Sequence, residues 1–141
     1  MAEKKETTRW IKNMLQSLDA CLDEAAKTEV MESCGRACAR GGVIGTARKF
    51  SGDLQGFLDR MAQWVGKDNV RHEGSVIHLV YPRCLCPTVA QDSSRLPDDY
   101  CLCSRGWLKE MFETVTGKPV EVELRHSIKR GADSCRFTVR L

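Results

Sequence analysis

The apolar residues of this chain change their spacing along the sequence, and this change limits the folds that it can adopt. Up to residue 65 they recur every three or four positions, the spacing of one face of a helix. Over residues 69–81 they alternate with polar residues, as in a strand with one buried face. A helical stretch and a second alternating stretch follow. This order favours an α+β fold in which helices pack on one face of an antiparallel four-stranded sheet.

The expected elements follow from these periods and from the turn residues between them. We predict helices near residues 6–27, 29–40 and 53–65, a hairpin near 69–81, a helix near 104–116 and a hairpin near 119–140. The predicted order is therefore ααα-ββ-α-ββ. The length of 141 residues is that of one domain, so we expect residues 1–141 to form a single domain.

Residues that commonly begin and end helices give the predicted boundaries. Thr28 is the expected N-cap of the second helix, Ser51 or Asp53 that of the third, and Ser104 that of the fourth, because these side chains accept hydrogen bonds from free helical N–H groups. Gly117 is expected to end the fourth helix, since glycine readily adopts the left-handed conformation found there.

Charge and composition argue against several classes of function. The net charge is +3, from 22 basic and 19 acidic residues that are interspersed, and nucleic-acid-binding domains usually carry a strongly basic face. No apolar run approaches the roughly 20 residues of a membrane span. The charged N-terminus lacks the apolar core of a signal peptide. We therefore expect a cytoplasmic protein whose partner is a small molecule or a metal ion; a homodimer is left open.

Cysteine is the residue that points most directly to chemistry. The eight cysteines are Cys21, Cys34, Cys38, Cys84, Cys86, Cys101, Cys103 and Cys135. Six of them form three close pairs, and in a reducing compartment clustered thiols more often bind metal or carry out redox chemistry than form lasting disulfides. Cys21, on an apolar helical stripe, and Cys135, at the start of a strand, are interpreted as buried packing residues.

The first candidate site is formed by two Cys-x-Cys motifs. Cys84 and Cys86 precede a loop rich in proline and charge, and Cys101 and Cys103 follow it. If the ends of the loop meet, four thiols converge, as in a closed tetrahedral zinc site with bonds of about 2.3 Å. Zinc is the default ligand, and copper(I) or an iron–sulfur cluster would suit the same thiolates. The alternatives are packing thiols without metal, or a redox pair.

A second candidate is a ligand-binding site on the second helix. Cys34 and Cys38 are one helical turn apart and share a face, and the neighbouring Arg36 favours the thiolate form of cysteine. Gly35 indicates a close approach of another group, because glycine within a helix is otherwise unfavourable. We expect Cys34, Cys38 and Arg36 to face a pocket; the alternative is an ordinary buried helix face.

Three C-terminal segments resemble a known family. Residues 101–108 (CLCSRGWL), 117–122 (GKPVEV) and 131–137 (GADSCRF) are similar to the vinyl-4-reductase-type ligand-binding domain. The whole cysteine pattern, with Cys34-Gly35-x-x-Cys38 on a helix, also resembles a group of prokaryotic proteins related to the L-2-amino-thiazoline-4-carboxylic acid hydrolase-like proteins. The resemblance implies a sensor or accessory module for small hydrophobic or metal-bearing ligands. The vinyl-4-reductase-type pattern often has a cysteine where this chain has Ser127.

Two enzymatic alternatives remain open at the level of sequence. The first is a hydrolase of a small thiazoline-like or amide substrate with a cysteine nucleophile, and the second is a thiol-disulfide redox protein. A nucleophilic cysteine requires a base, and the histidines of the chain are His72, His78 and His126. His78 and His126 are also the alternative metal ligands.

Overall fold

The computed structural model describes residues 2–83 and 100–141. In this part of the chain the α-helices are α1 (Ala2–Cys21), α2 (Glu24–Arg40), α3 (Ile44–Lys49), α4 (Leu54–Val65) and α5 (Leu102–Thr116). The strands are β1 (Val70–Glu73), β2 (Val76–Tyr81), β3 (Glu121–His126) and β4 (Cys135–Arg140), with short 3₁₀ turns at Lys67–Asn69 and Ile128–Arg130. None of the described helices is long and apolar enough to cross a membrane.

The strands form one antiparallel sheet in the order β1-β2-β4-β3. The β1–β2 hairpin turns at Gly74, whose φ is +60°. Strand β4 lies between β2 and β3, so that Val139 is paired with both Ile77 and Val122. The predicted α+β class, with helices on an antiparallel four-stranded sheet, is confirmed.

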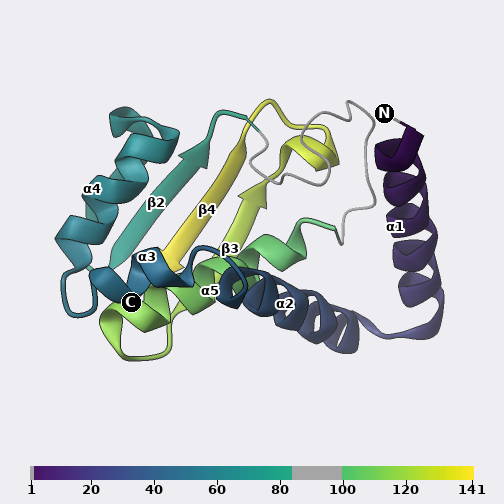
Figure 1. The fold of residues 1–141 in the computed structure, drawn as a ribbon, viewed down its shortest axis with the longest axis horizontal. Coiled ribbons are helices and arrows are strands. Elements are labelled where there is room, and N and C mark those ends of the chain that lie inside the picture. Colours follow the sequence, from purple (N-terminus) through teal and green to yellow (C-terminus); the bar gives the residue numbers. More distant parts are fainter. Residues whose placement is uncertain (1, 84–99) are drawn as a thin grey trace.

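The two faces of the sheet differ in character. Alternate residues of each strand point to opposite faces, and on the inner face they pack against α4 and α5 (Figure 1). Phe57 of α4 meets Phe112 of α5 edge to face, with ring centroids 5.3 Å apart. The main core also includes Ile77, Leu79, Tyr81, Val122, Cys135, Phe137 and Val139 from the strands. Polar and charged side chains dominate the outer face.

Helix α2 crosses α5 at a point where two glycines replace side chains. A Cβ atom at Gly35 would overlap the carbonyl oxygen of Cys103, and one at Gly106 would overlap the carbonyl oxygen of Glu32. The backbones of the two helices can therefore touch only because both positions lack a side chain. Gly35 does serve a close approach, as its position in the sequence indicated, and the partner is the backbone of α5.

Ion pairs hold this crossing on one side. The Arg36 guanidinium of α2 donates to Glu110 at 3.0 Å and to Glu113 at 2.8 Å, both on α5. Arg40 binds the Glu110 carboxylate at 2.9 Å. Hydrogen bonding to Arg40 and Arg36 lowers the pKa of Glu110, against the opposing effect of its burial. Charge and close packing thus act at the same contact.

The junction of the first two helices differs from the prediction. Helix α1 ends at Cys21, and α2 begins at Glu24 rather than beyond Thr28. The N-cap of α2 is Asp23, whose carboxylate accepts a hydrogen bond from the Ala26 N–H at 2.8 Å. The predicted Thr28 cap is therefore wrong, because Asp23 already satisfies the first turn.

Two further boundaries depend on local contacts. The sequence did not indicate α3, a six-residue helix in which Ile44 and Ala47 are buried, because two buried positions do not make a recognisable stripe. Helix α5 begins at Leu102 with Cys101 as N-cap and no side-chain cap, so Ser104 lies inside the first turn. Asp53 is confirmed as the cap of α4, accepting from the Gly56 N–H at 3.0 Å.

Candidate functional site

The predicted four-thiol metal site is not tested by the described residues. Cys84 and Cys86 lie outside the described residues, so their convergence with Cys101 and Cys103 stays a prediction. Within residues 2–83 and 100–141, no three His, Cys, Asp or Glu side chains are grouped so that they could hold a metal ion. Any such site therefore needs ligands from beyond the described part of the chain.

Two buried thiols are each hydrogen bonded by one of two consecutive residues. Cys101 caps α5 and Cys135 begins β4, and each is 8% exposed. The Ser127 hydroxyl donates a hydrogen bond to the Cys101 sulfur at 2.8 Å, and the Ile128 amide donates one to the Cys135 sulfur at 3.4 Å. Two consecutive residues, Ser127 and Ile128, thus each donate a hydrogen bond to one of the two sulfurs. We call Cys101, Ser127 and Cys135 the thiol site.

The connection between β3 and β4 positions this site. After His126 the chain forms a single 3₁₀ turn and reverses at Gly131, whose φ is +98°. The Ser127 carbonyl accepts hydrogen bonds from the amides of Arg130 at 3.1 Å and Ala132 at 3.0 Å. These bonds hold Ser127 at the start of the turn, where it is 1% exposed. The hydroxyl is therefore directed inward by backbone geometry.

The thiol site lies where the main core meets a second apolar cluster. On the core side Tyr81 is paired with Cys135 across β2 and β4. Burial raises the pKa of Tyr81, and negative charge on Cys135 adds to the increase. On the other side Cys101 packs with Leu15, Met31 and Tyr100. The two sulfurs consequently have polar contacts within largely apolar surroundings.

The other predicted ligand-binding residues lie apart from this site. Cys34 and Cys38 are solvent-exposed, whereas we expected them to face a pocket. Arg36 is engaged by the two glutamates of α5 and supports the helix crossing. Cys21 is also exposed, contrary to its interpretation as a packing residue, because α1 ends there. Cys135 is buried, as predicted.

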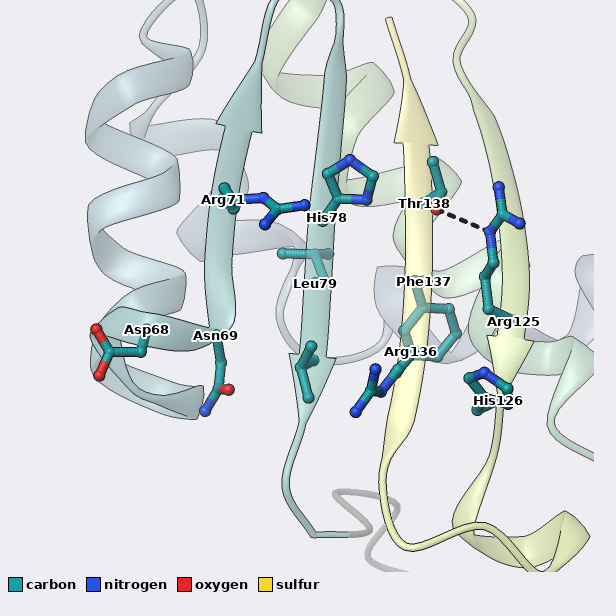
Figure 2. Close-up of a pocket in the computed structure, with 11 residues that line it drawn as sticks. Asp68, Asn69, Arg71, His78, Leu79, Arg125, His126, Arg136, Phe137 and Thr138 are labelled. Carbon is teal, nitrogen blue, oxygen red and sulfur yellow. Dashed lines mark hydrogen bonds between the residues drawn. The ribbon is translucent and has the colours of Figure 1, made fainter.

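His78 and His126 belong to the outer face of the sheet. His78 and His126 line an open groove of about 370 Å³, together with three arginines that the sequence analysis did not single out (Figure 2). Because side chains alternate along a strand, His78 on β2 points away from the face that Tyr81 joins. His78 and His126 therefore lie on the face of the sheet opposite to the one that Tyr81 and Cys135 join.

The contacts of Ser127 with Cys101 and of Ile128 with Cys135 were not recognised from the sequence. The signal that could have drawn attention to Ser127 was the resemblance to the vinyl-4-reductase-type pattern, which implied a cysteine at that position. Cys103, by contrast, is half-buried, and its amide donates a 3.4 Å hydrogen bond to the Tyr100 carbonyl.

Comparison with solved structures identifies the fold. The chain aligns with a trafficking protein particle complex subunit 3 from Naegleria fowleri, covalently bound to palmitic acid, at a TM-score of 0.61 and 19% identity, covering 97% of this chain and 93% of that one. It also aligns with the phenol-responsive sensory domain of the transcription activator PoxR with phenol, at a TM-score of 0.53 and 15% identity, covering 94% of this chain and 73% of that one. At these identities the likeness shows a common fold.

The resemblance expected from the sequence is supported at the level of the fold, which a sensory domain shares, but not at the level of the two named families. Neither solved structure is described as a vinyl-4-reductase-type domain or a thiazoline-carboxylic acid hydrolase, so those finer assignments stay predictions. A sensory domain does share the fold. A sequence search finds no match among curated proteins. A family model matches residues 1–141, and the chain therefore belongs to the family described as "Family of unknown function (DUF6144)".

Proposed function

We propose that this protein is a sensor-like or accessory module that binds a soft metal ion through clustered thiols, with Cys101 and Cys135 as two of the ligands. The observation that carries the proposal is the hydrogen bonding of both buried sulfurs by Ser127 and Ile128. Each sulfur is held in place by its hydrogen bond before any ligand arrives, which lowers the ordering cost of binding.

The chemistry of thiols sets the identity of the ion. Thiolates favour zinc, copper(I) and iron–sulfur clusters over hard cations. Zinc is the default, and a closed zinc site uses four ligands. The proposal takes the remaining two from Cys84, Cys86 and Cys103, on the strength of the Cys-x-Cys motifs in the sequence. The buried Ser127 hydroxyl would then lie beside the site and hydrogen bond to one ligating sulfur.

Metal analysis tests this proposal directly. Protein purified anaerobically should contain close to one zinc per chain, and a Cys101→Ser, Cys135→Ser double variant should lose it. Cys34→Ser, Cys38→Ser is the matched control, because these thiols are exposed and apart from the site, and its metal content should be unchanged. Metal-free protein that also fails to bind added zinc or copper(I) would contradict the proposal.

A small apolar molecule is the second candidate ligand. The observation in its favour is the packing of Leu15, Met31 and Tyr100 around Cys101, which places a thiol inside an apolar cluster. The structural relatives hold a covalently bound palmitic acid in one case and phenol in the other. If this candidate is correct, phenol or a fatty acid should raise the melting temperature of metal-free protein, and Met31→Ala should weaken that effect.

A further inference from the structure

Strand pairing places basic side chains side by side on the outer face of the sheet. Arg71 on β1 is opposite His78 on β2, and Arg136 on β4 is opposite His126 on β3. Residues directly opposite one another have Cβ atoms about 4.5–5.5 Å apart. These four side chains come from all four strands and form two pairs, Arg71 with His78 and Arg136 with His126, that line the same groove (Figure 2).

An irregularity in β3 adds a fifth basic group. The register between β3 and β4 shifts between Leu124 and His126, which leaves Arg125 as an extra residue. In a regular strand, neighbouring side chains would point to opposite faces, whereas Arg125 and His126 are both exposed and both line the groove. The Arg125 Nε donates to the Thr138 hydroxyl at 3.2 Å, which holds the guanidinium over the sheet.

The acidic residues near this groove do not neutralise all of it. Glu73 forms an ion pair with Arg71 at 2.9 Å, and Glu123 forms one with Arg125 at 3.2 Å. The Arg136 Nε donates instead to the Ser134 hydroxyl at 3.2 Å, and no carboxylate of the described residues forms an ion pair with it. Arg136 is therefore the groove arginine whose guanidinium is not occupied by a carboxylate of the described residues.

The arginines and carboxylates in and beside the groove are equal in number but are not all paired. Asp68, next to the start of β1, is the acidic side chain among the groove's described lining residues. With Glu73 and Glu123 beside the groove, three carboxylates stand against the three arginines, and Arg136 has no ion pair with a carboxylate of the described residues. Guanidinium groups bind phosphate and carboxylate oxygens through paired, charge-assisted hydrogen bonds, and several of them together select anions with more than one charge.

We propose that this outer-face groove, lined by Arg71, His78, Arg125, His126 and Arg136, binds a small multiply charged oxyanion of the phosphate class. Arg136 is the central binding residue, and Arg125 binds the same anion from the neighbouring strand. The site is independent of the thiol site, because it lies on the opposite face of the sheet and contains no cysteine. The phosphate group can be free or part of a larger small molecule.

Calorimetric titration of the purified full chain with pyrophosphate, and separately with inorganic phosphate, tests the proposal. Saturable binding of one pyrophosphate per chain is expected, weakened by added sodium chloride because salt screens exposed charges. Arg136→Gln should weaken binding about tenfold or more, the effect of losing a charged hydrogen bond. Arg125→Gln should weaken it in the same direction. Arg48→Gln, an exposed arginine of α3 outside the groove, removes the same charge and should leave affinity unchanged.

The outcomes separate the alternatives. A built site is supported if pyrophosphate binds more tightly than phosphate, and if Arg136→Gln weakens this binding whereas the control Arg48→Gln does not. Equal weakening by Arg48→Gln would overturn it, since net charge would then explain the affinity. Affinity for oligonucleotides that rises with their length and exceeds that for pyrophosphate would also overturn it, in favour of a nucleic-acid surface. Chemical-shift changes at β3 and β4 amides should accompany binding in the folded variants.

Discussion

Gly35 of α2 lies directly against the carbonyl oxygen of Cys103, so that even a methyl group at this position would collide with the backbone of α5. Gly106 has the same relationship to Glu32 in the opposite direction. The two helices therefore cross at their closest distance where each contributes a glycine. This contact fixes the first turn of α5, which carries Cys101, relative to α2.

The first prediction concerns this crossing. Gly35→Ala should destabilise the protein by several kcal/mol, of the order seen for overpacked cores, although alanine is favoured over glycine within helices by about 1 kcal/mol. Chemical denaturation measures the change. Gly45→Ala is the matched control: Gly45 is also helical, and a Cβ there would have no atom within 4 Å. It should be neutral or slightly stabilising, and equal behaviour of the two variants would contradict the close crossing.

The second prediction concerns Glu110 and pH. Its folded-state pKa lies below the ordinary value of 4.5 because Arg40 and Arg36 bind the carboxylate. A depressed carboxyl pKa stabilises the folded state above the unfolded-state value, and this contribution is lost as the pH falls through the folded-state value. Glu110→Gln should therefore cost about 1–2 kcal/mol at neutral pH, towards the lower end because Arg40 is exposed.

The difference in stability between wild type and Glu110→Gln should shrink once the pH falls below about 4. Urea denaturation at a series of pH values measures it. Glu29→Gln provides the control, because Glu29 is an exposed residue of α2 with no ion pair to the described residues. A difference that stays constant from neutral to acidic pH would show that the arginines do not stabilise the carboxylate of Glu110.

The third prediction concerns the reactivity of individual thiols. Cys21, Cys34 and Cys38 are exposed, whereas Cys101 and Cys135 are buried. An alkylating reagent should modify the exposed three first and the buried pair at least about tenfold more slowly, since an opening cost of only about 1.4 kcal/mol already gives that factor. Mass spectrometry of peptides at successive times resolves each site. Rapid modification of Cys135 in folded protein would refute its buried position.

The sequence predicted those parts of the fold that depend on local pattern. The hydrophobic period placed α4, α5 and both hairpins to within two residues, and Asp53 and Gly117 act as the predicted helix ends. Gly117 adopts a φ of +73°. These features are local because the residues involved are close in the chain. The short α3 was missed since too few of its residues are buried to form a pattern.

The thiol site could not be predicted because it depends on contacts distant in sequence. Cys101 meets Ser127, and Cys135 meets the next residue, only because β4 inserts between β2 and β3 and the turn after β3 folds inward. The groove is similarly non-local. Its arginines are scattered in the sequence, and the bulge that brings Arg125 to the outer face leaves no mark in the hydrophobic period.

The fourth prediction joins Ser127 to the proposed metal site. Replacing its hydroxyl by a thiol in Ser127→Cys puts a third sulfur beside Cys101, at a position where the hydroxyl now lies 2.8 Å from the Cys101 sulfur. It also introduces a cysteine at the position where the resemblance to the vinyl-4-reductase-type pattern implied one. Each added thiolate strengthens binding of a soft ion, so the affinity for zinc should rise by about tenfold or more, the factor that 1.4 kcal/mol produces.

Competition with a chromophoric zinc chelator measures this change in affinity. Ser75→Cys, at the exposed β1–β2 turn, adds a thiol far from the site and serves as the control, with no expected gain. Ser127→Ala should leave zinc bound but weaken it, because a hydrogen bond to a ligating sulfur is removed while the sulfurs themselves remain. If Ser127→Cys binds zinc no more tightly than Ser75→Cys, then Cys101 and residue 127 do not form part of a metal site. The second candidate, an apolar ligand that packs around Cys101, then becomes the better explanation of why this thiol is buried.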